Sequence, residues 1–447
     1  MIQIRDRRIR VIYLLSILQL GLMACKPGTG NEIVSVEKYQ EYPLELISYI
    51  SQQNQQYNVD ERISETYVEI DQLAYYDNLQ LIRKRIIKDP CRLMVVLKSD
   101  AYGHGLENLG KLSEFAGADY IGITETMEIK KLRSLGVNLP IMRIRLASYR
   151  ELHTVHTHPE IFGEVEEMVG NLHMVKYLSK LACSQDRSIK IHINLNTGEM
   201  SRNGFDMHIL HTRDSIGELL KLEKIEVAGI MTHFANADTE HPDMLREKIS
   251  EFREDAEWII AEGGLKREDV ILHVAATSLA LRVPESHLDM VRLGSIIFGE
   301  KIDKESPEEL KPVMSVYSSV GQIMYYPKGS HVGYGSIHQL EQDSYLANIP
   351  IGKSNGIPRN INNALIRGHK FSVAGAMSMN TTMVDITRLH DQIKPGDEVV
   401  FIGRQGDEEI SAEDIWESTG INPWDMHNNV GRLNYEERYP KMLDDIP

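Results

Sequence analysis

The chain has 447 residues, of which 42% are apolar and 26% charged, an ordinary globular composition with room for two or three domains. These proportions exclude collagen-like, coiled-coil, disordered and polytopic membrane proteins. The 65 acidic against 49 basic residues give a formal net charge of −16, which argues against a nucleic-acid partner and favours a protein that handles a small molecule.

The first 25 residues are organised like an export signal. Four arginines among residues 5–10 precede Val11–Ala24, an apolar stretch of fourteen residues that is shorter than the roughly 20 a spanning helix needs. The stretch ends in Leu22-Met23-Ala24-Cys25, which resembles a bacterial lipobox. We therefore expect residues 1–25 to be a lipoprotein signal peptide and Cys25 to carry the lipid. A cleaved secretory signal with an incidental cysteine is the alternative, and both interpretations predict export to the periplasmic face of the cell envelope.

Residues 26–60 are polar, rich in Gln and Asn and aperiodic, which is typical of a flexible tether. From residue 61 to about residue 305, short apolar runs alternate with amphipathic stretches of helical period. Eight such alternations predict a (β/α)8 TIM barrel. The predicted barrel strands are Met94–Lys98, Tyr120–Thr124, Ile141–Arg145, Ile161–Val165, Lys190–Asn194, Glu226–Met231, Val270–His273 and Met290–Leu293.

From residue 306 to residue 447 the pattern changes to β-rich runs separated by Gly, Pro and Asn, with one helix expected near Ala412–Ser418. These runs predict a C-terminal all-β domain after the α/β barrel. The expected strands there are Ser315–Tyr326, Ser344–Ile351, Lys370–Met379, Thr382–Thr387 and Glu398–Ile402.

A lysine closes the first predicted barrel strand, in the sequence Lys98-Ser-Asp-Ala-Tyr-Gly-His-Gly105. Catalytic residues of TIM barrels lie at the C-terminal ends of strands. A lysine amine withdrawn from water at such a position is a nucleophile toward aldehydes, whereas an amine that extends to solvent is the ordinary alternative. This segment closely resembles the pyridoxal-phosphate lysine motif of alanine racemases, a fold-type III family built from a TIM barrel and a C-terminal β domain. Further matches follow in order from about residue 65 to residue 405.

The resemblance implies roles for residues around the cofactor, pyridoxal 5'-phosphate. Lys98 would bind its aldehyde and act as one catalytic base, and Tyr102 would bind its phosphate. Arg202 matches the arginine near the cofactor's phenolic oxygen and the substrate carboxylate, and His233 matches the imidazole that packs on the pyridine ring. The other cofactor-binding residues that the resemblance predicts are Thr277, Ser278, Arg292 and Ser295.

Arg292 is the informative match, because it corresponds to the arginine that faces the pyridine nitrogen. A permanent cation there keeps that nitrogen unprotonated and weakens the ring as an electron sink. This favours rapid reprotonation of the substrate over transamination or decarboxylation.

Racemisation removes a proton from one face of the substrate and returns it on the other, so a second base is required. Tyr334, in Val332-Gly-Tyr-Gly335, resembles the catalytic tyrosine that the family's β domain extends into the barrel of the other subunit. Met379 corresponds to the methionine whose backbone contacts the substrate carboxylate across the same interface. The resemblance therefore implies a head-to-tail homodimer with active sites shared between subunits.

Several positions depart from the family pattern. Ala276 replaces an asparagine in the His273–Ser278 segment, and Lys353 stands where a tyrosine lines the substrate entrance. His427 is the nearest counterpart of a C-terminal phosphate-binding tyrosine, and Asn194 falls near the position of a carbamylated lysine.

Three segments resemble exported broad-specificity amino-acid racemases more than cytoplasmic alanine racemases: Arg143–Ser148, Met200–Gly204 and Ser378–Asn380. The leading hypothesis is therefore an envelope enzyme that interconverts L- and D-amino acids, alanine or a wider set, with Lys98 and Tyr334 as its two bases. The alternatives are a fold-type III amino-acid decarboxylase and a lipoprotein that binds the cofactor or an amino acid without turnover. The histidines at 153, 156 and 158 lack partners at metal-ligand spacing, so we expect no metal site.

Overall fold

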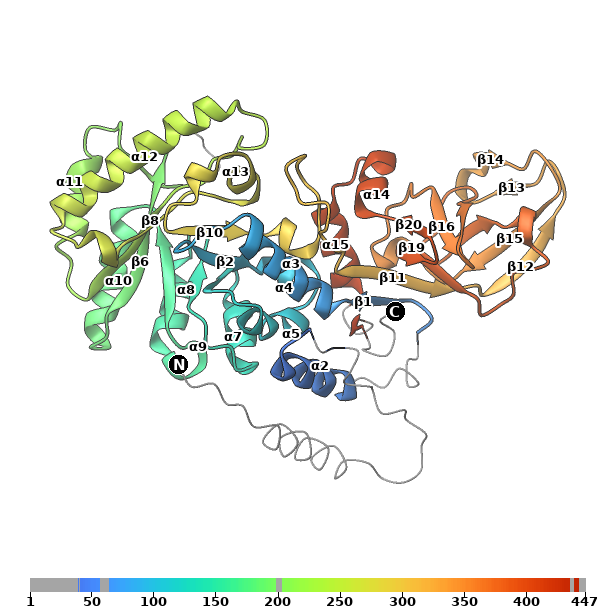
Figure 1. Cartoon of the computed structure of the whole chain (residues 1–447), viewed down its shortest axis with the longest axis horizontal. Helices are drawn as coiled ribbons and strands as arrows, with labels where there is room; N and C mark the ends of the chain where they lie inside the picture. Colours follow the sequence, from blue (N-terminus) through green and yellow to red (C-terminus); the bar gives the residue numbers. More distant parts are fainter. Residues whose placement is uncertain (1–38, 40, 57–63, 198–202, 435–437, 442–447) are drawn as a thin grey trace, which may run out of the picture.

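The computed structural model describes residues 39, 41–56, 64–197, 203–434 and 438–441. The expected signal peptide with Cys25, most of the expected tether and the expected substrate-binding Arg202 lie outside these residues. Figure 1 shows two bodies side by side along the long axis, a barrel and a β domain.

Eight parallel strands form the barrel and confirm the predicted fold class. Their order in the sheet is β10-β2-β3-β4-β5-β6-β8-β9, and backbone hydrogen bonds from Asp289 to Leu272 and from Arg292 to Ala275 bring its two end strands together. The strands are β2 (Arg92–Val96), β3 (Tyr120–Ile123), β4 (Ile141–Arg143), β5 (Val165–Val169), β6 (Ile189–Asn196), β8 (Ile225–Met231), β9 (Ile271–His273) and β10 (Met290–Leu293), with the short β7 (Phe205–Asp206) beside β6.

The fourth predicted strand, Ile161–Val165, was wrong. Ile161 lies in the short helix α9 (Pro159–Phe162) with 40% of its surface exposed, and the strand begins only at Val165. Pro159 favours the first helical position and Gly163, at φ 64°, ends the helix, so the apolar run is divided between two elements.

Helices surround the barrel, each burying one stripe of side chains. In α12 (Pro242–Glu262), Leu245, Ile249, Phe252, Ala256 and Ile259 are buried at helical spacing. The other helices of this region are α3 (Gln72–Arg85), α4 (Lys98–Tyr102), α5 (Leu106–Leu109), α6 (Leu112–Phe115), α7 (Thr126–Ser134), α8 (Tyr149–Thr157), α10 (Leu172–Ser184), α11 (Thr212–Leu219), α13 (Thr277–Arg282), and the 3-10 turns η3 (Arg267–Asp269), η4 (Pro284–Ser286) and η5 (Ser295–Phe298).

A separate cluster of buried side chains comes from the barrel strands alone, and it consists mainly of methionines. Unbranched thioether side chains fill an irregular interior without demanding one precise shape. Its buried members are Met94, Met142, Met168, Met231, Ile271 and Met290.

The chain leaves the barrel after η5 and enters an antiparallel β domain at Met314. A larger sheet has the order β17-β16-β19-β11-β1-β21, with β20 beside β19, and a smaller one has the order β12-β15-β18. The strands are β11 (Met314–Ser319), β12 (Gln322–Tyr326), β13 (His331–Val332), β14 (His338–Gln339), β15 (Ser344–Ile349), β16 (Asn363–Ile366), β17 (His369–Ser372), β18 (Thr382–Asp385), β19 (Glu398–Gln405), β20 (Glu408–Ile410) and β21 (Arg438–Pro440). The 3-10 turns are η6 (Tyr334–Ser336), η7 (Lys353–Asn355) and η8 (Thr387–Leu389), and the helices are α14 (Ala412–Thr419), as predicted, and α15 (Pro423–Leu433).

Two N-terminal elements differ from the expectation. Strand β1 (Tyr67–Ile70) lies in the segment assigned to the barrel, but it pairs antiparallel with β11 of the β domain, and Tyr67 stacks on Tyr317. Helix α2 (Leu44–Gln56) lies in the segment assigned to a flexible tether, yet its Leu46 and Ile50 are buried and Tyr49 packs against Phe115. Burial of these side chains stabilises a helix whose polar residues masked its apolar stripe in the sequence.

None of the helices in the described part of the chain combines the length and hydropathy needed to span a membrane. Cys91 is buried and Cys183 is exposed, and both are free thiols. These two cysteines therefore form no disulfide with each other.

Candidate active site

An open cavity of about 250 Å³ lies at the C-terminal ends of the barrel strands. It gathers residues that the sequence separates by almost two hundred positions, because parallel strands end at one rim of the barrel. The predicted site residues that line it are Lys98, Tyr102, His233, Thr277, Ser278, Arg292 and Ser295.

Lys98 follows β2 after a single residue, Leu97, and begins an unusual turn. Ser99, Asp100, Ala101 and Tyr102 all have φ between 53° and 55°, in the left-handed region that costs an L-residue about 1–2 kcal/mol each. Hydrogen bonds hold the turn: the Ala101 amide donates to the Leu97 carbonyl at 2.9 Å, and the Asp100 amide donates to Glu128 Oε1 at 3.0 Å. Backbone strain maintained at a cavity is characteristic of a functional site.

Arg292 lies on β10 and lines the cavity with only 5% of its surface exposed. Its guanidinium is fixed by hydrogen bonds to four acceptors: Nη1 donates to the His273 carbonyl and ring Nδ1 at 2.9 Å each, and Nη2 donates to the carbonyls of Thr232 at 2.8 Å and Val274 at 3.1 Å. A planar group held at this many points presents its charge in one direction. His233 follows β8 at the same rim.

Hydroxyl groups also line the cavity. Tyr102, Thr277, Ser278 and Ser295 line it, and Thr277 Oγ1 accepts a hydrogen bond from the Gly294 amide at 3.3 Å. A Cβ at Gly294 would lie 2.9 Å from the Tyr102 hydroxyl, so glycine is needed for this approach. Such a group of hydroxyls suits a phosphate.

These residues fit pyridoxal phosphate, because its aldehyde, its ring and its phosphate each need a different kind of partner. The cavity offers an amine for the aldehyde, an arginine and an imidazole for the ring, and hydroxyls for the phosphate. Ala276 also lines it, where the family has an asparagine, so one side-chain amide of the usual set is replaced by a methyl group.

Tyr334 and Met379 lie elsewhere. Both belong to the β domain, and they are 68% and 54% exposed and absent from the lining of the cavity. Within this chain the described residues therefore bring Lys98 together with the cofactor-binding residues but not with the predicted second base.

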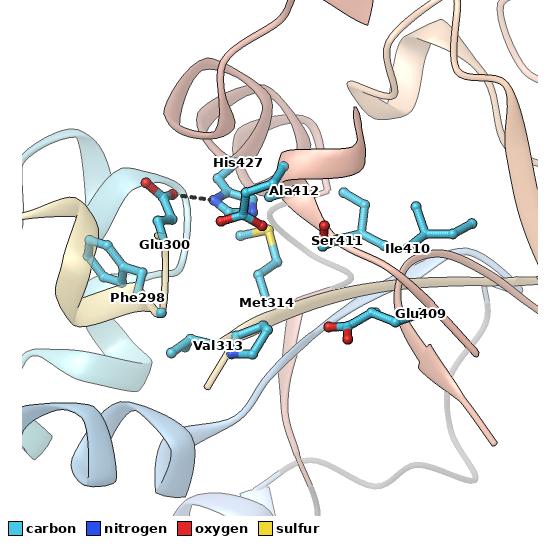
Figure 2. Close-up of a pocket in the computed structure, with 14 residues that line it drawn as sticks. Phe298, Glu300, Val313, Met314, Glu409, Ile410, Ser411, Ala412 and His427 are labelled. Carbon is cyan, nitrogen blue, oxygen red and sulfur yellow. Dashed lines mark hydrogen bonds and ion pairs between the residues drawn. The ribbon is translucent and has the colours of Figure 1, made fainter. Parts of the chain in front are cut away.

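His427 does not contribute to the cavity, although it was the nearest sequence counterpart of a phosphate-binding tyrosine. Figure 2 shows it in a smaller pocket between barrel and β domain, where its Nδ1 lies 2.8 Å from Glu300 Oε1 and both side chains are buried. Trp424, one turn earlier on α15, reaches the cavity instead. No motif in the sequence pointed to Trp424, which the packing of α15 brings to the cavity.

The remaining departures are placed as follows. Asn194 is buried and donates from Nδ2 to the Asn203 carbonyl at 2.6 Å. Lys353 lies in η7 of the β domain, outside the cavity lining, and its amide donates to the Ser378 carbonyl at 3.1 Å. Ser354 beside it donates from its amide and hydroxyl to the Met379 carbonyl at 2.9 and 2.8 Å, which fixes the predicted substrate-binding segment.

Comparisons with known proteins agree with this architecture. Residues 70–301 match the family described as alanine racemase, N-terminal domain, and residues 313–439 match alanine racemase, C-terminal domain. A lysine racemase of Proteus mirabilis is 38% identical over 80% of this chain and 86% of its own, and a broad specificity amino-acid racemase of Pseudomonas taetrolens is 36% identical over 93% and 97%. The crystal structure of an alanine racemase from Streptomyces lavendulae superposes with a TM-score of 0.75 at 27% identity, covering 86% of this chain and 98% of that one.

Proposed function

The chain belongs to the alanine racemase family, and on that premise we propose that it is a pyridoxal-phosphate-dependent racemase that interconverts L- and D-amino acids. The observation that carries the proposal is the cavity that unites Lys98, His233 and Arg292 with a group of hydroxyls at one rim of the barrel. Bound pyridoxal phosphate supplies a conjugated ring that stabilises the charge left when the α-proton departs.

The residues of the chain divide the remaining work. Lys98 Nζ would hold the cofactor and exchange the α-proton on one face of the substrate, while Tyr102, Thr277, Ser278 and Ser295 bind the phosphate. Arg292 is a buried cation that lines the cavity, whereas a fold-type III decarboxylase typically has an acidic residue opposite the pyridine nitrogen. Arg202 and Met379 would bind the substrate carboxylate.

The second base would be Tyr334 Oη of a partner subunit in a head-to-tail homodimer. Two observations support this arrangement: Tyr334 is exposed and lies outside the cavity of its own chain, and Met379, predicted to act beside it, is exposed as well. A two-fold symmetric dimer, in which the barrel of each subunit faces the β domain of the other, would then contain two complete sites.

We extend the proposal to substrates larger than alanine, including cationic amino acids. The named relatives racemise lysine or a broad set of amino acids. The exposed Asp238 lines the cavity, so a carboxylate is available to a positively charged side chain.

A chiral assay tests the function. Purified protein loaded with cofactor is expected to racemise L-Ala, L-Lys, L-Arg, L-Ser and L-Met, with alanine and lysine as the decisive pair. Lys98→Ala should abolish covalent labelling by cofactor and borohydride, whereas Tyr334→Phe should keep the label and lower turnover by about 100-fold, the size of a lost general base. Unchanged optical purity with all five substrates, or release of CO₂ from lysine or arginine, would contradict a racemase.

We also propose that the enzyme is exported and anchored by a lipid on Cys25, with the adjoining segment leading from the membrane to the docked helix α2. The support is the basic and apolar order of residues 1–25 and their lipobox-like ending. Wild-type protein should then sediment with membranes and incorporate labelled palmitate. Cys25→Ser should prevent lipid incorporation and membrane sedimentation; recovery of wild-type and variant protein in the same fraction would refute the anchor.

A further inference from the structure

A chain of hydrogen bonds crosses the buried interior of the barrel from the cavity to β5. Arg292 Nη1 lies 2.9 Å from His273 Nδ1, His273 Nε2 lies 2.9 Å from His192 Nδ1, and His192 Nε2 lies 2.7 Å from Glu166 Oε2. All four side chains are more than nine-tenths buried. Four strands thus contribute one member each to a single polar network.

The chemistry of its two ends determines the direction of every hydrogen atom. A guanidinium has donors only, so His273 Nδ1 must accept, and a neutral His273 then carries its hydrogen on Nε2. That hydrogen points at His192 Nδ1, which leaves the hydrogen of His192 on Nε2, facing the Glu166 carboxylate. Burial, followed by the charge of Arg292, holds the pKa of His273 well below its usual range, which agrees with a neutral ring.

The neighbouring backbone is built to admit this network. Gly229 on β8 pairs in register with His192, and a Cβ at Gly229 would lie 2.2 Å from His192 Nδ1 and 2.6 Å from its Cε1. Gly229 does not have a positive φ, so glycine is required at this position for space and not for an unusual backbone conformation. Any larger residue at 229 would displace the imidazole and break the chain in its middle.

We propose that Glu166, acting through His192 and His273, is a positioning residue for Arg292 that keeps the guanidinium paired with an imidazole acceptor. If His273 adopted its other tautomer, a ring N–H would face the Arg292 N–H, and the guanidinium would turn away from that edge of the cavity. The inference rests on the proposed function, in which Arg292 faces the pyridine nitrogen. It assigns to Glu166, His192 and Gly229 the control of racemisation against transamination.

The first test uses the wild-type protein without cofactor, labelled with ¹⁵N-histidine. Two buried imidazoles should show the neutral Nε2–H tautomer by long-range ¹H–¹⁵N correlation, assigned with His192→Gln and His273→Gln. A neutral Nδ1–H tautomer or an imidazolium at either position would overturn the proposal. This readout is independent of catalysis, so correct tautomers in a protein without racemase activity would refute the proposed function and leave the network intact.

The second test changes the network without touching Arg292. Glu166→Gln retains an oxygen that accepts from His192, so it should preserve both tautomers and the absorption spectrum of bound cofactor. Glu166→Leu and Gly229→Ala should shift that spectrum and raise pyridoxamine formed per racemisation event by about tenfold, the effect of one lost buried hydrogen bond.

Gly217→Ala is the matched control, because a Cβ there meets only Glu262 Oε1 at 3.6 Å. It should leave the tautomers, the spectrum and the partition ratio unchanged. If both Glu166→Leu and Gly229→Ala keep the wild-type absorption spectrum and form no more pyridoxamine per racemisation event than the wild type, the proposal is overturned. If either variant fails to fold, the other and the wild-type tautomers decide.

Discussion

Glu128, at the third position of α7, connects the strained turn that begins at Lys98 with the end of the next barrel strand, β3. Its Oε1 accepts from the Asp100 amide at 3.0 Å, and its Oε2 accepts from the amides of Thr124 at 3.0 Å and Glu125 at 2.8 Å. The side chain is buried, so each of these bonds forms away from competing water. One carboxylate thereby joins the ends of β2 and β3.

Glu128→Gln should weaken these hydrogen bonds, although glutamine has nearly the same size and shape as glutamate. A glutamine has one acceptor oxygen, and its amide would oppose at least one backbone N–H. We expect the free energy of unfolding to fall by about 1.5–3 kcal/mol, the contribution of a hydrogen bond to a charged group, and covalent labelling of Lys98 by cofactor and borohydride to slow. Denaturant unfolding and the rate of labelling measure the two effects.

Asp414→Asn provides the control for that prediction. Asp414 is an exposed carboxylate that accepts from the Ser411 amide at 2.9 Å in the capping box of α14, so its replacement removes a helix-capping charge far from Lys98 along the chain. Asp414→Asn should lower stability and leave labelling at the wild-type rate. If Lys98 is labelled as fast in Glu128→Gln as in Asp414→Asn, the hydrogen bonds of Glu128 are not needed to hold the turn for reaction with the cofactor.

At the scale of elements, the strands that the sequence predicted well are those whose apolar runs have polar or turn residues on both sides. Tyr120–Ile123 and Met290–Leu293 were placed within a residue of their ends. Ile161–Val165 was not, because a proline-started helix and a strand shared one apolar run. Helix α2 was missed because tertiary burial of Leu46 and Ile50, and not local propensity, stabilises it.

Close approach between elements explains a further part of the site that the sequence did not reveal. A Cβ at Gly103 would lie 2.2 Å from the His427 carbonyl, and a Cβ at Gly431 would lie 1.9 Å from the Gly103 carbonyl. Because Gly103 in the lysine motif has no side chain, α15 can pack against the turn that begins at Lys98. The motif located Gly103, but its partner helix, and with it Trp424, required the fold.

At the scale of the whole molecule, the predicted residues divide into two groups. Those at or just after the ends of barrel strands met in one cavity, because a closed parallel sheet brings its strand ends together whatever their separation in the chain. Tyr334 and Met379 did not join them: both belong to the β domain, which lies beside the barrel in Figure 1, and neither lines the cavity. In the proposed dimer, a second copy of the chain would supply the base that this cavity lacks.

Subunit complementation tests that conclusion. Lys98→Ala and Tyr334→Phe homodimers should each be nearly inactive, since every site in them lacks one base. After subunit exchange, a mixed dimer pairs the intact Lys98 of one chain with the intact Tyr334 of the other in one of its two sites. Random exchange of equal amounts should therefore restore about a quarter of the wild-type activity, because half of the dimers are mixed. As a control, mixing Lys98→Ala with the double variant Lys98→Ala/Tyr334→Phe should restore no activity, because no chain then carries Lys98. If the mixture of Lys98→Ala and Tyr334→Phe is no more active than the sum of its components, both bases belong to one chain.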